Sequence, residues 1–282
     1  MIQINKQLES PTNKPILYDV FSNPASKKQP LVVFCHGYKG FKDWGAWHLV
    51  AKAFMKANCC FVKFNFTHNG GTIEQPIDFP DLNAFAENNY TKELTDLKTM
   101  VNFLLSDAFS CSEFIDKNNV TVIGHSRGGG IASIFASEDS RVTKLITWAS
   151  ICDFGKRTAT IGELDQWRKD GVKYVLNGRT KQQMPHNYQF YEDYKANKDR
   201  LNIEVAVKAL KIPHLIIHAK DDPSVKFDEA LCLQQWNPNS QLITVDNANH
   251  VFNAKHPWDE NDLPEALQLV VDTSVNFVFN ID

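Results

Sequence analysis

The sequence predicts an α/β fold with a mostly parallel central sheet, and two patterns carry this prediction. Short runs rich in β-branched and aromatic residues alternate along the chain with longer amphipathic stretches, which is the element order of strand–helix–strand units. Several of the short runs are apolar on both faces, as are the strands of a parallel sheet that helices cover on both sides. A chain of 282 residues, 43% of them hydrophobic, can bury a core of that size in one large domain.

The individual elements follow from the positions of these runs. Strands are expected at residues 16–21, 31–35, 60–66, 120–123, 144–148, 214–218 and 241–245. Amphipathic stretches predict helices at residues 44–57, 90–106, 126–137, 227–235 and 263–279. We therefore expect a single domain over residues 1–282.

The segment between Trp148 and Pro213 breaks the alternation. It holds more than sixty residues, is rich in aromatic side chains and offers no strand for the main sheet. Loops of this length inside a compact domain are seldom structureless. We expect an inserted lid subdomain at residues 151–212, made of short helices with a hairpin near residues 171–179, packed over one edge of the sheet.

The stretch Gly124-His125-Ser126-Arg127-Gly128 stands where an apolar strand ends and a helix begins. In that context the G-x-S-x-G pattern is typical of a nucleophile elbow, in which a strained serine exposes its Oγ. The outer glycines then avoid collisions with the neighbouring strand and helix. A plain glycine-rich turn is the alternative, because so short a pattern also occurs by chance. Ser126 is the candidate nucleophile.

A serine nucleophile needs a base and an orienting acid, and the chain offers both in a suitable order. His250 follows strand 241–245 and precedes the last helix, while Asp221 and Asp222 follow strand 214–218. Successive residues at a strand end point to opposite sides, so only one of the two carboxylates is expected to reach His250.

Four motifs are in register with those of a known family: VVFCHGYKG at residues 32–40, GHSRGG at 124–129, IIHAKDDPSV at 216–225 and NANHVF at 247–252. With them the chain resembles the α/β-hydrolase superfamily, and within it the lidded serine hydrolases similar to dienelactone hydrolases and cinnamoyl esterases. The resemblance covers nearly the whole chain and is weakest in the predicted lid. It implies an α/β-hydrolase fold, with helices flanking the mostly parallel sheet and an inserted lid or cap.

The resemblance also implies which carboxylate acts. The family pattern His-Gly-x-x-Asp-Pro-x-Val aligns with residues 218–225 and selects Asp222 as the acid. Ala219 stands where the family usually has glycine, a small departure in the path of this loop. Asp221 stays the alternative acid and otherwise reads as a solvated loop carboxylate.

An oxyanion hole of two backbone N–H groups is implied in the same way. The resemblance gives one donor to Tyr38, in the loop after the early strand, and the other to Arg127, directly after the nucleophile. Gly37 lets that loop approach closely. His36 is a candidate base by type, but the resemblance implies a structural role for it.

Three further side chains are tentative substrate contacts, each with a plainer reading. His68 follows strand 60–66 and either lines the cleft or is a hydrogen-bonded loop histidine. Trp167 and Tyr174 belong to the core of the lid, line a pocket for an aromatic or acyl group, or form part of an exposed patch for a partner. The Arg127 side chain either pairs with a substrate carboxylate or is held by a nearby acidic side chain.

Composition excludes several classes of function. A formal net charge of −3 without clustered basic residues offers no surface for nucleic acid. No apolar run is long enough to span a membrane and the N-terminal residues lack a signal-peptide pattern, so we expect a soluble, cytoplasmic protein. The six cysteines form no CxxC pair and read as buried free thiols.

No metal or organic cofactor is expected. His214, His218 and Asp222 could imitate a metal cluster, but His214 and His218 are four residues apart on one strand. At about 3.3 Å per residue they lie too far apart to bind one ion.

The sequence thus predicts a serine hydrolase that cleaves a carboxylic ester through a covalent acyl-enzyme, with a small-molecule ester or acyl compound as its partner. Ser126 would be the nucleophile, His250 the base and Asp222 the orienting acid. The same constellation also serves a short-peptide peptidase or a thioesterase. A non-catalytic ligand-binding protein with this fold is the alternative from another class.

Overall fold

The computed structural model describes residues 1–26 and 28–281 and contains an eight-stranded sheet in the order β1-β2-β4-β3-β5-β6-β9-β10. The strands are β1 (Ile2–Leu8), β2 (Ile16–Phe21), β3 (Gln29–Cys35), β4 (Cys60–Phe64), β5 (Ile115–His125), β6 (Lys144–Trp148), β9 (His214–Ala219) and β10 (Gln241–Val245). Strand β2 runs antiparallel to both of its neighbours, and the pairs from β4 to β10 are parallel. The predicted α/β class with a mostly parallel sheet is confirmed.

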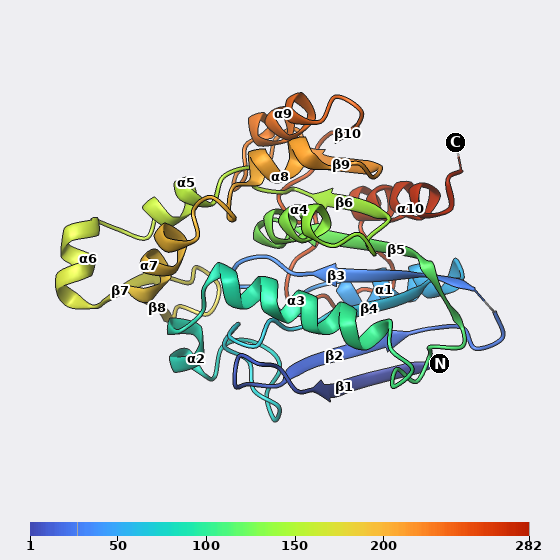
Figure 1. Cartoon of the computed structure of the whole chain (residues 1–282), viewed down its shortest axis with the longest axis horizontal. Helices are drawn as coiled ribbons and strands as arrows, with labels where there is room; N and C mark the ends of the chain where they lie inside the picture. Colours follow the sequence, from blue (N-terminus) through green and yellow to red (C-terminus); the bar gives the residue numbers. More distant parts are fainter. Residues whose placement is uncertain (27, 282) are drawn as a thin grey trace.

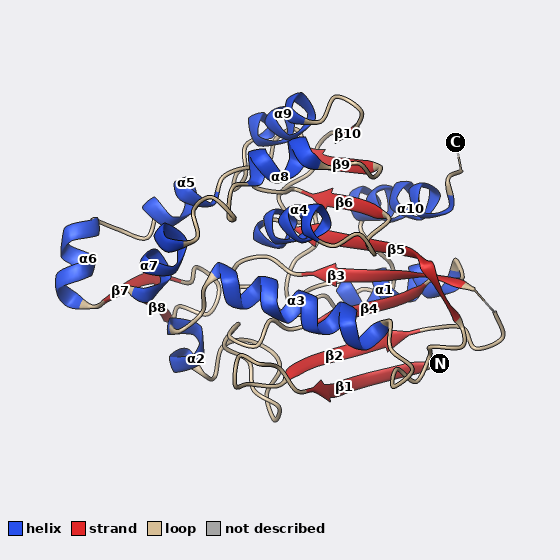
Figure 2. Cartoon of the chain, in the orientation of Figure 1, coloured by secondary structure: helices blue, strands red, loops and turns tan. Residues whose placement is uncertain are grey.

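Helices cover the sheet on both faces, as Figures 1 and 2 show. One hydrophobic cluster lies between the sheet and helices α3 (Tyr90–Leu104), α4 (Arg127–Glu138), α8 (Ile203–Ala209) and α9 (Phe227–Trp236). The other lies under α1 (Trp47–Lys56) and α10 (Glu265–Phe279). Strands β2, β3, β4, β6 and β9 are buried at every residue, which explains their continuous apolar runs.

The predicted helix at residues 44–57 begins later than expected. Helix α1 starts at Trp47, after Gly45, whose φ is +55°. A residue in that left-handed conformation cannot continue a right-handed helix. The short helix α2 (Leu82–Ala86) was not predicted.

The segment between β6 and β9 contains helices α5 (Phe154–Ala159), α6 (Leu164–Asp170), α7 (Gln189–Ala196) and α8, together with strands β7 (Val172–Leu176) and β8 (Gln183–Asn187). Strands β7 and β8 form an antiparallel pair of their own, close to the expected hairpin. Elements α5 to α7 lie beyond the carboxyl ends of the parallel strands (Figure 1). The insertion therefore stands at the end of the sheet where α/β proteins place their ligands.

Two further observations bear on the compositional predictions. All six cysteines are free thiols, and five of them are buried. Among the described residues, no helix is both long enough and apolar enough to cross a membrane.

Candidate active site

Ser126 occupies a sharp turn between β5 and α4. Its φ is +56° and its ψ is −120°, a conformation that costs a non-glycine residue about 1–3 kcal/mol. The flanking glycines make the turn possible. A Cβ at Gly124 would lie 2.2 Å from the carbonyl oxygen of Gly128, and a Cβ at Gly128 would lie 2.5 Å from that of Cys35.

A chain of hydrogen bonds runs from Ser126 through His250 to Asp222. The distance between Ser126 Oγ and His250 Nε2 is 2.9 Å, and that between His250 Nδ1 and Asp222 Oδ2 is 2.7 Å. Because a carboxylate only accepts, Nδ1 carries the proton and Nε2 is left to accept from the serine hydroxyl. The three residues stand in loops after β5, β9 and β10, at one end of the sheet.

Asp222 is held from the opposite side by its own loop. Its Oδ1 accepts hydrogen bonds from the N–H groups of Ser224 at 2.7 Å and Val225 at 2.9 Å. Burial on its own would raise the pKa of Asp222, but the bond from His250 and the two loop bonds lower it below the usual range. Asp221, in contrast, is exposed.

Two cavities meet at Ser126. The larger, of about 330 Å³, includes Arg127, Arg157, Ile161, Val175 and Ser224 in its lining. The smaller, of about 160 Å³, is lined by the 36–40 loop, Trp44 and Trp47. Tyr38, Ser126 and His250 line both.

The loop after β3 approaches the nucleophile closely. A Cβ at Gly37 would lie only 2.8 Å from the Cβ of Ser126, so the following residue, Tyr38, lies beside the elbow. Arg127 is the first residue of α4, and the N–H groups of a helix's first turn have no partner within the helix. Both predicted oxyanion donors therefore belong to segments that border Ser126.

The Arg127 side chain is buried and paired with an acid. Its Nη1 lies 3.2 Å from Glu93 Oε1, and its guanidinium stands 4.3 Å from the ring centre of Tyr38 and 5.5 Å from that of Phe190. Burial raises the pKa of the Glu93 carboxyl, and Arg127 opposes that rise. The ion pair confirms the interpretation in which a nearby acidic side chain holds Arg127.

The three tentative substrate contacts do not line either cavity at Ser126. His68 is buried and bonds to Thr67 Oγ1 at 2.8 Å. Trp167 is buried inside the insertion, where its Nε1 donates to the carbonyl oxygen of His186 at 2.8 Å. Tyr174 is 58% exposed.

Three further histidines, His36, His214 and His218, form hydrogen bonds within the fold. His36 Nδ1 donates to the Gly37 carbonyl oxygen and its Nε2 accepts from the Phe66 N–H, and burial lowers its pKa to about 4. His214 bonds to Thr147, and His218 Nε2 donates to the carbonyl oxygen of Val225. Within the part of the chain that the structure describes, no cluster of three potential ligands could hold a metal ion.

The cavity contacts contributed by the insertion were not predicted individually. No motif contains Arg157, Ile161 or Val175, and no sequence pattern distinguishes these three from the rest of segment 151–212. Their position in the insertion was the one available signal.

Fold and site together define a hydrolase-type α/β protein with a serine at a nucleophile-elbow turn. The profile described as the alpha/beta hydrolase family matches residues 32–260. The chain belongs to the α/β hydrolase family, as its motifs predicted. No curated protein sequence matches it significantly.

Solved structures with the same fold cover almost all of the chain. Est1E from Butyrivibrio proteoclasticus has 15% sequence identity and a TM-score of 0.72, and the match covers 99% of each chain. Its structure with ferulic acid bound matches with 16% identity, a TM-score of 0.71 and 98% of each chain. Dienelactone hydrolase from Anabaena variabilis has 14% identity, a TM-score of 0.65, and coverage of 99% of this chain and 97% of its own. At these identities the matches establish the fold.

Proposed function

We propose that this protein is a serine hydrolase that cleaves carboxylic esters through a covalent acyl-enzyme. The observation that carries the proposal is the continuous chain of hydrogen bonds from Ser126 Oγ through His250 to Asp222, beside two cavities that a substrate could enter. An ester is favoured because ferulic acid, a carboxylic acid, is bound in the structure of the similar protein Est1E.

In the proposed mechanism, Ser126 Oγ attacks the acyl carbon while His250 Nε2 takes its proton. Asp222 keeps the other ring nitrogen protonated and stabilises the imidazolium that forms. The backbone N–H groups of Tyr38 and Arg127 bind the oxyanion. His250 then gives its proton to the leaving alcohol, and a water molecule, activated by the same histidine, releases the carboxylic acid.

We propose that residues 151–212 act as a lid over this site. Arg157, Ile161 and Val175 come from the insertion and line the larger cavity, which supports the proposal. The acyl group or the alcohol of the substrate would then contact the lid, so the lid would select the substrate. His68, Trp167 and Tyr174 remain outside the proposed binding surface because they line neither cavity.

Intact mass after incubation with a fluorophosphonate tests the nucleophile. The wild-type protein should gain one adduct, folded Ser126→Ala should gain none, and Ser137→Ala, a serine farther along α4, should label like the wild type. Kinetics with acetyl and feruloyl esters, an acyl thioester and a dipeptide amide would then separate esterase from thioesterase and peptidase. A folded wild-type protein that takes no adduct would favour the non-catalytic ligand-binding reading.

A further inference from the structure

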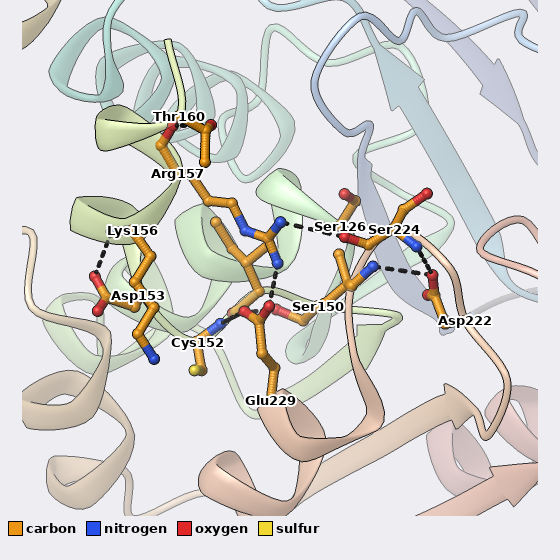
Figure 3. A network of polar contacts seen from close by, with 12 residues as sticks. Ser126, Ser150, Cys152, Asp153, Lys156, Arg157, Thr160, Asp222, Ser224 and Glu229 are labelled. Carbon is orange, nitrogen blue, oxygen red and sulfur yellow. Dashed lines mark hydrogen bonds and ion pairs between the residues drawn. The ribbon is translucent and has the colours of Figure 1, made fainter. Parts of the chain in front are cut away.

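Glu229 joins three segments of the chain beside the candidate active site. It stands on α9, and its Oε2 accepts a hydrogen bond from the N–H of Cys152 at 2.9 Å. Its Oε1 pairs with Nη2 of Arg157, on α5. The first residues of the insertion, helix α5 and helix α9 therefore meet at one carboxylate (Figure 3).

Arg157 extends this network to the loop that carries Asp222. Its Nη1 donates to the carbonyl oxygen of Ser224 at 3.2 Å, while the N–H of Ser224 donates to Asp222. The peptide groups on both sides of Ser224 are thus fixed, one by Asp222 and one by Arg157, as Figure 3 shows. The next carbonyl group, that of Val225, is held by His218.

The same arginine contributes to the cavity at Ser126. Arg157 lines it together with Thr160 and Ile161, from the end of α5 and the turn that follows. A displacement of α5 would therefore act on the cavity and, through the bond to Ser224, on the loop of Asp222. A guanidinium suits this task because its planar fork can bond a carboxylate and a carbonyl oxygen at once in fixed directions.

We propose that Arg157 is a positioning residue that couples the insertion to the orientation of Asp222. The inference rests on the proposed function, because it assumes that Asp222 orients His250 for reaction. Arg157 also lines the larger cavity, but its proposed effect on Asp222 passes through Ser224 and requires no contact with the substrate. Small misplacements of catalytic groups are costly, about 100-fold in rate for 1 Å, so we expect the loss of Arg157 to lower kcat about tenfold.

The test compares Arg157→Ala with a matched arginine. Arg200 also joins the insertion to the rest of the protein through a carboxylate, because its Nε and Nη2 bond Glu138 at 2.7 and 2.8 Å, yet it lines neither cavity at Ser126. For each variant we would measure the labelling rate with a small fluorophosphonate, and kcat and KM for an uncharged acetyl ester. Thermal unfolding would check that each variant is folded.

Arg157→Ala should lower kcat and the labelling rate by a similar factor, about tenfold, with KM nearly unchanged, because both reactions need the same activated serine. Arg157→Lys should recover part of the loss, since an ammonium can bond only loosely to both acceptors. Arg200→Ala should match the wild type in both rates. If Arg157→Ala fails to fold, Glu229→Gln is the substitute variant, and it should lower kcat and the labelling rate together, each by less than tenfold.

Three results would overturn the inference. An unchanged labelling rate in Arg157→Ala would exclude positioning, and a raised KM with unchanged kcat would make Arg157 a substrate-binding residue. An equal loss in Arg200→Ala would show a general effect of loosening the insertion. A wild-type protein that never labels would instead contradict the proposed function itself.

Discussion

Replacing Asp222 by asparagine should nearly abolish hydrolysis while leaving the protein folded. Asp222 Oδ1 accepts two loop N–H groups, at 2.7 and 2.9 Å. The asparagine carbonyl oxygen must take that place, which turns its NH₂ group toward His250 Nδ1. Two donors cannot face each other, so His250 must move its proton to Nε2. In that tautomer the ring cannot accept the proton of Ser126, because Nε2 already carries one.

The expected loss is about 10⁴-fold in kcat, as the wrong tautomer causes in serine proteases. This corresponds to about 5 kcal/mol of transition-state stabilisation. The assay is steady-state hydrolysis of the best ester found in the substrate comparison, with Asp221→Asn as the matched control because Asp221 is the exposed neighbour. Activity within tenfold of wild type in Asp222→Asn, or a larger loss in Asp221→Asn, would refute the assignment of the acid.

Three further predictions concern the surroundings of the site. Glu93→Ala leaves the buried Arg127 guanidinium without its carboxylate, so the free energy of unfolding in denaturant should fall by about 3–5 kcal/mol. A fall below about 1 kcal/mol would mean that the aromatic rings around Arg127 stabilise its buried charge without Glu93. Tyr38→Phe removes the 2.7 Å bond from Tyr38 Oη to His186, so the free energy of unfolding should fall by about 1–3 kcal/mol. Because the variant keeps the backbone N–H, kcat should stay within about threefold of the wild-type value. A 100-fold fall in kcat would instead show that the hydroxyl takes part in the reaction. Burial lowers the pKa of several histidines to about 4 or about 3, so the unfolded chain takes up protons first as the pH falls below 6.5. Stability should then decline toward pH 4 by up to about 1.4 kcal/mol per pH unit for each of them; an unfolding temperature that is constant from pH 7 to pH 5 would contradict this. These histidines are His36, His68, His125, His186 and His214.

The sequence predicted the strands of the main sheet that are buried on both faces, and also the partly exposed edge strand β10, but it missed β1. Strand β1 is an edge strand with mostly exposed residues, so its sequence IQINKQL contains no apolar run. The elbow at Ser126 was predictable because its glycines and serine are local in the chain. His250 could be found by type and order, because α/β folds bring the carboxyl ends of parallel strands together. Type and order left Asp221 and Asp222 as alternatives, and the family resemblance selected Asp222.

The contacts that the insertion makes with the rest of the protein could not be predicted from local sequence patterns. Helices α5 and α6 have six and seven residues, too few for a clear amphipathic period. Arg157 bonds Ser224 and Glu229, which lie 67 and 72 residues farther along the chain. No local pattern encodes such a pairing, because it depends on where the fold places α5.

The loops at the site need tethers of their own because the sheet fixes only the strand ends. Neighbouring strands are about 4.8 Å apart, yet β9 ends at Ala219 and β10 at Val245, several residues before Asp222 and His250. His125 supplies one tether: its Nε2 donates to the carbonyl oxygen of His250 at 2.9 Å, and burial, which lowers its pKa to about 3, keeps the ring neutral. The elbow therefore holds the His250 loop directly, while Arg157 holds the Asp222 loop from the insertion. The insertion is thus bonded to two loops at the site, to the Asp222 loop through Arg157 and to the 36–40 loop through the bond between Tyr38 and His186.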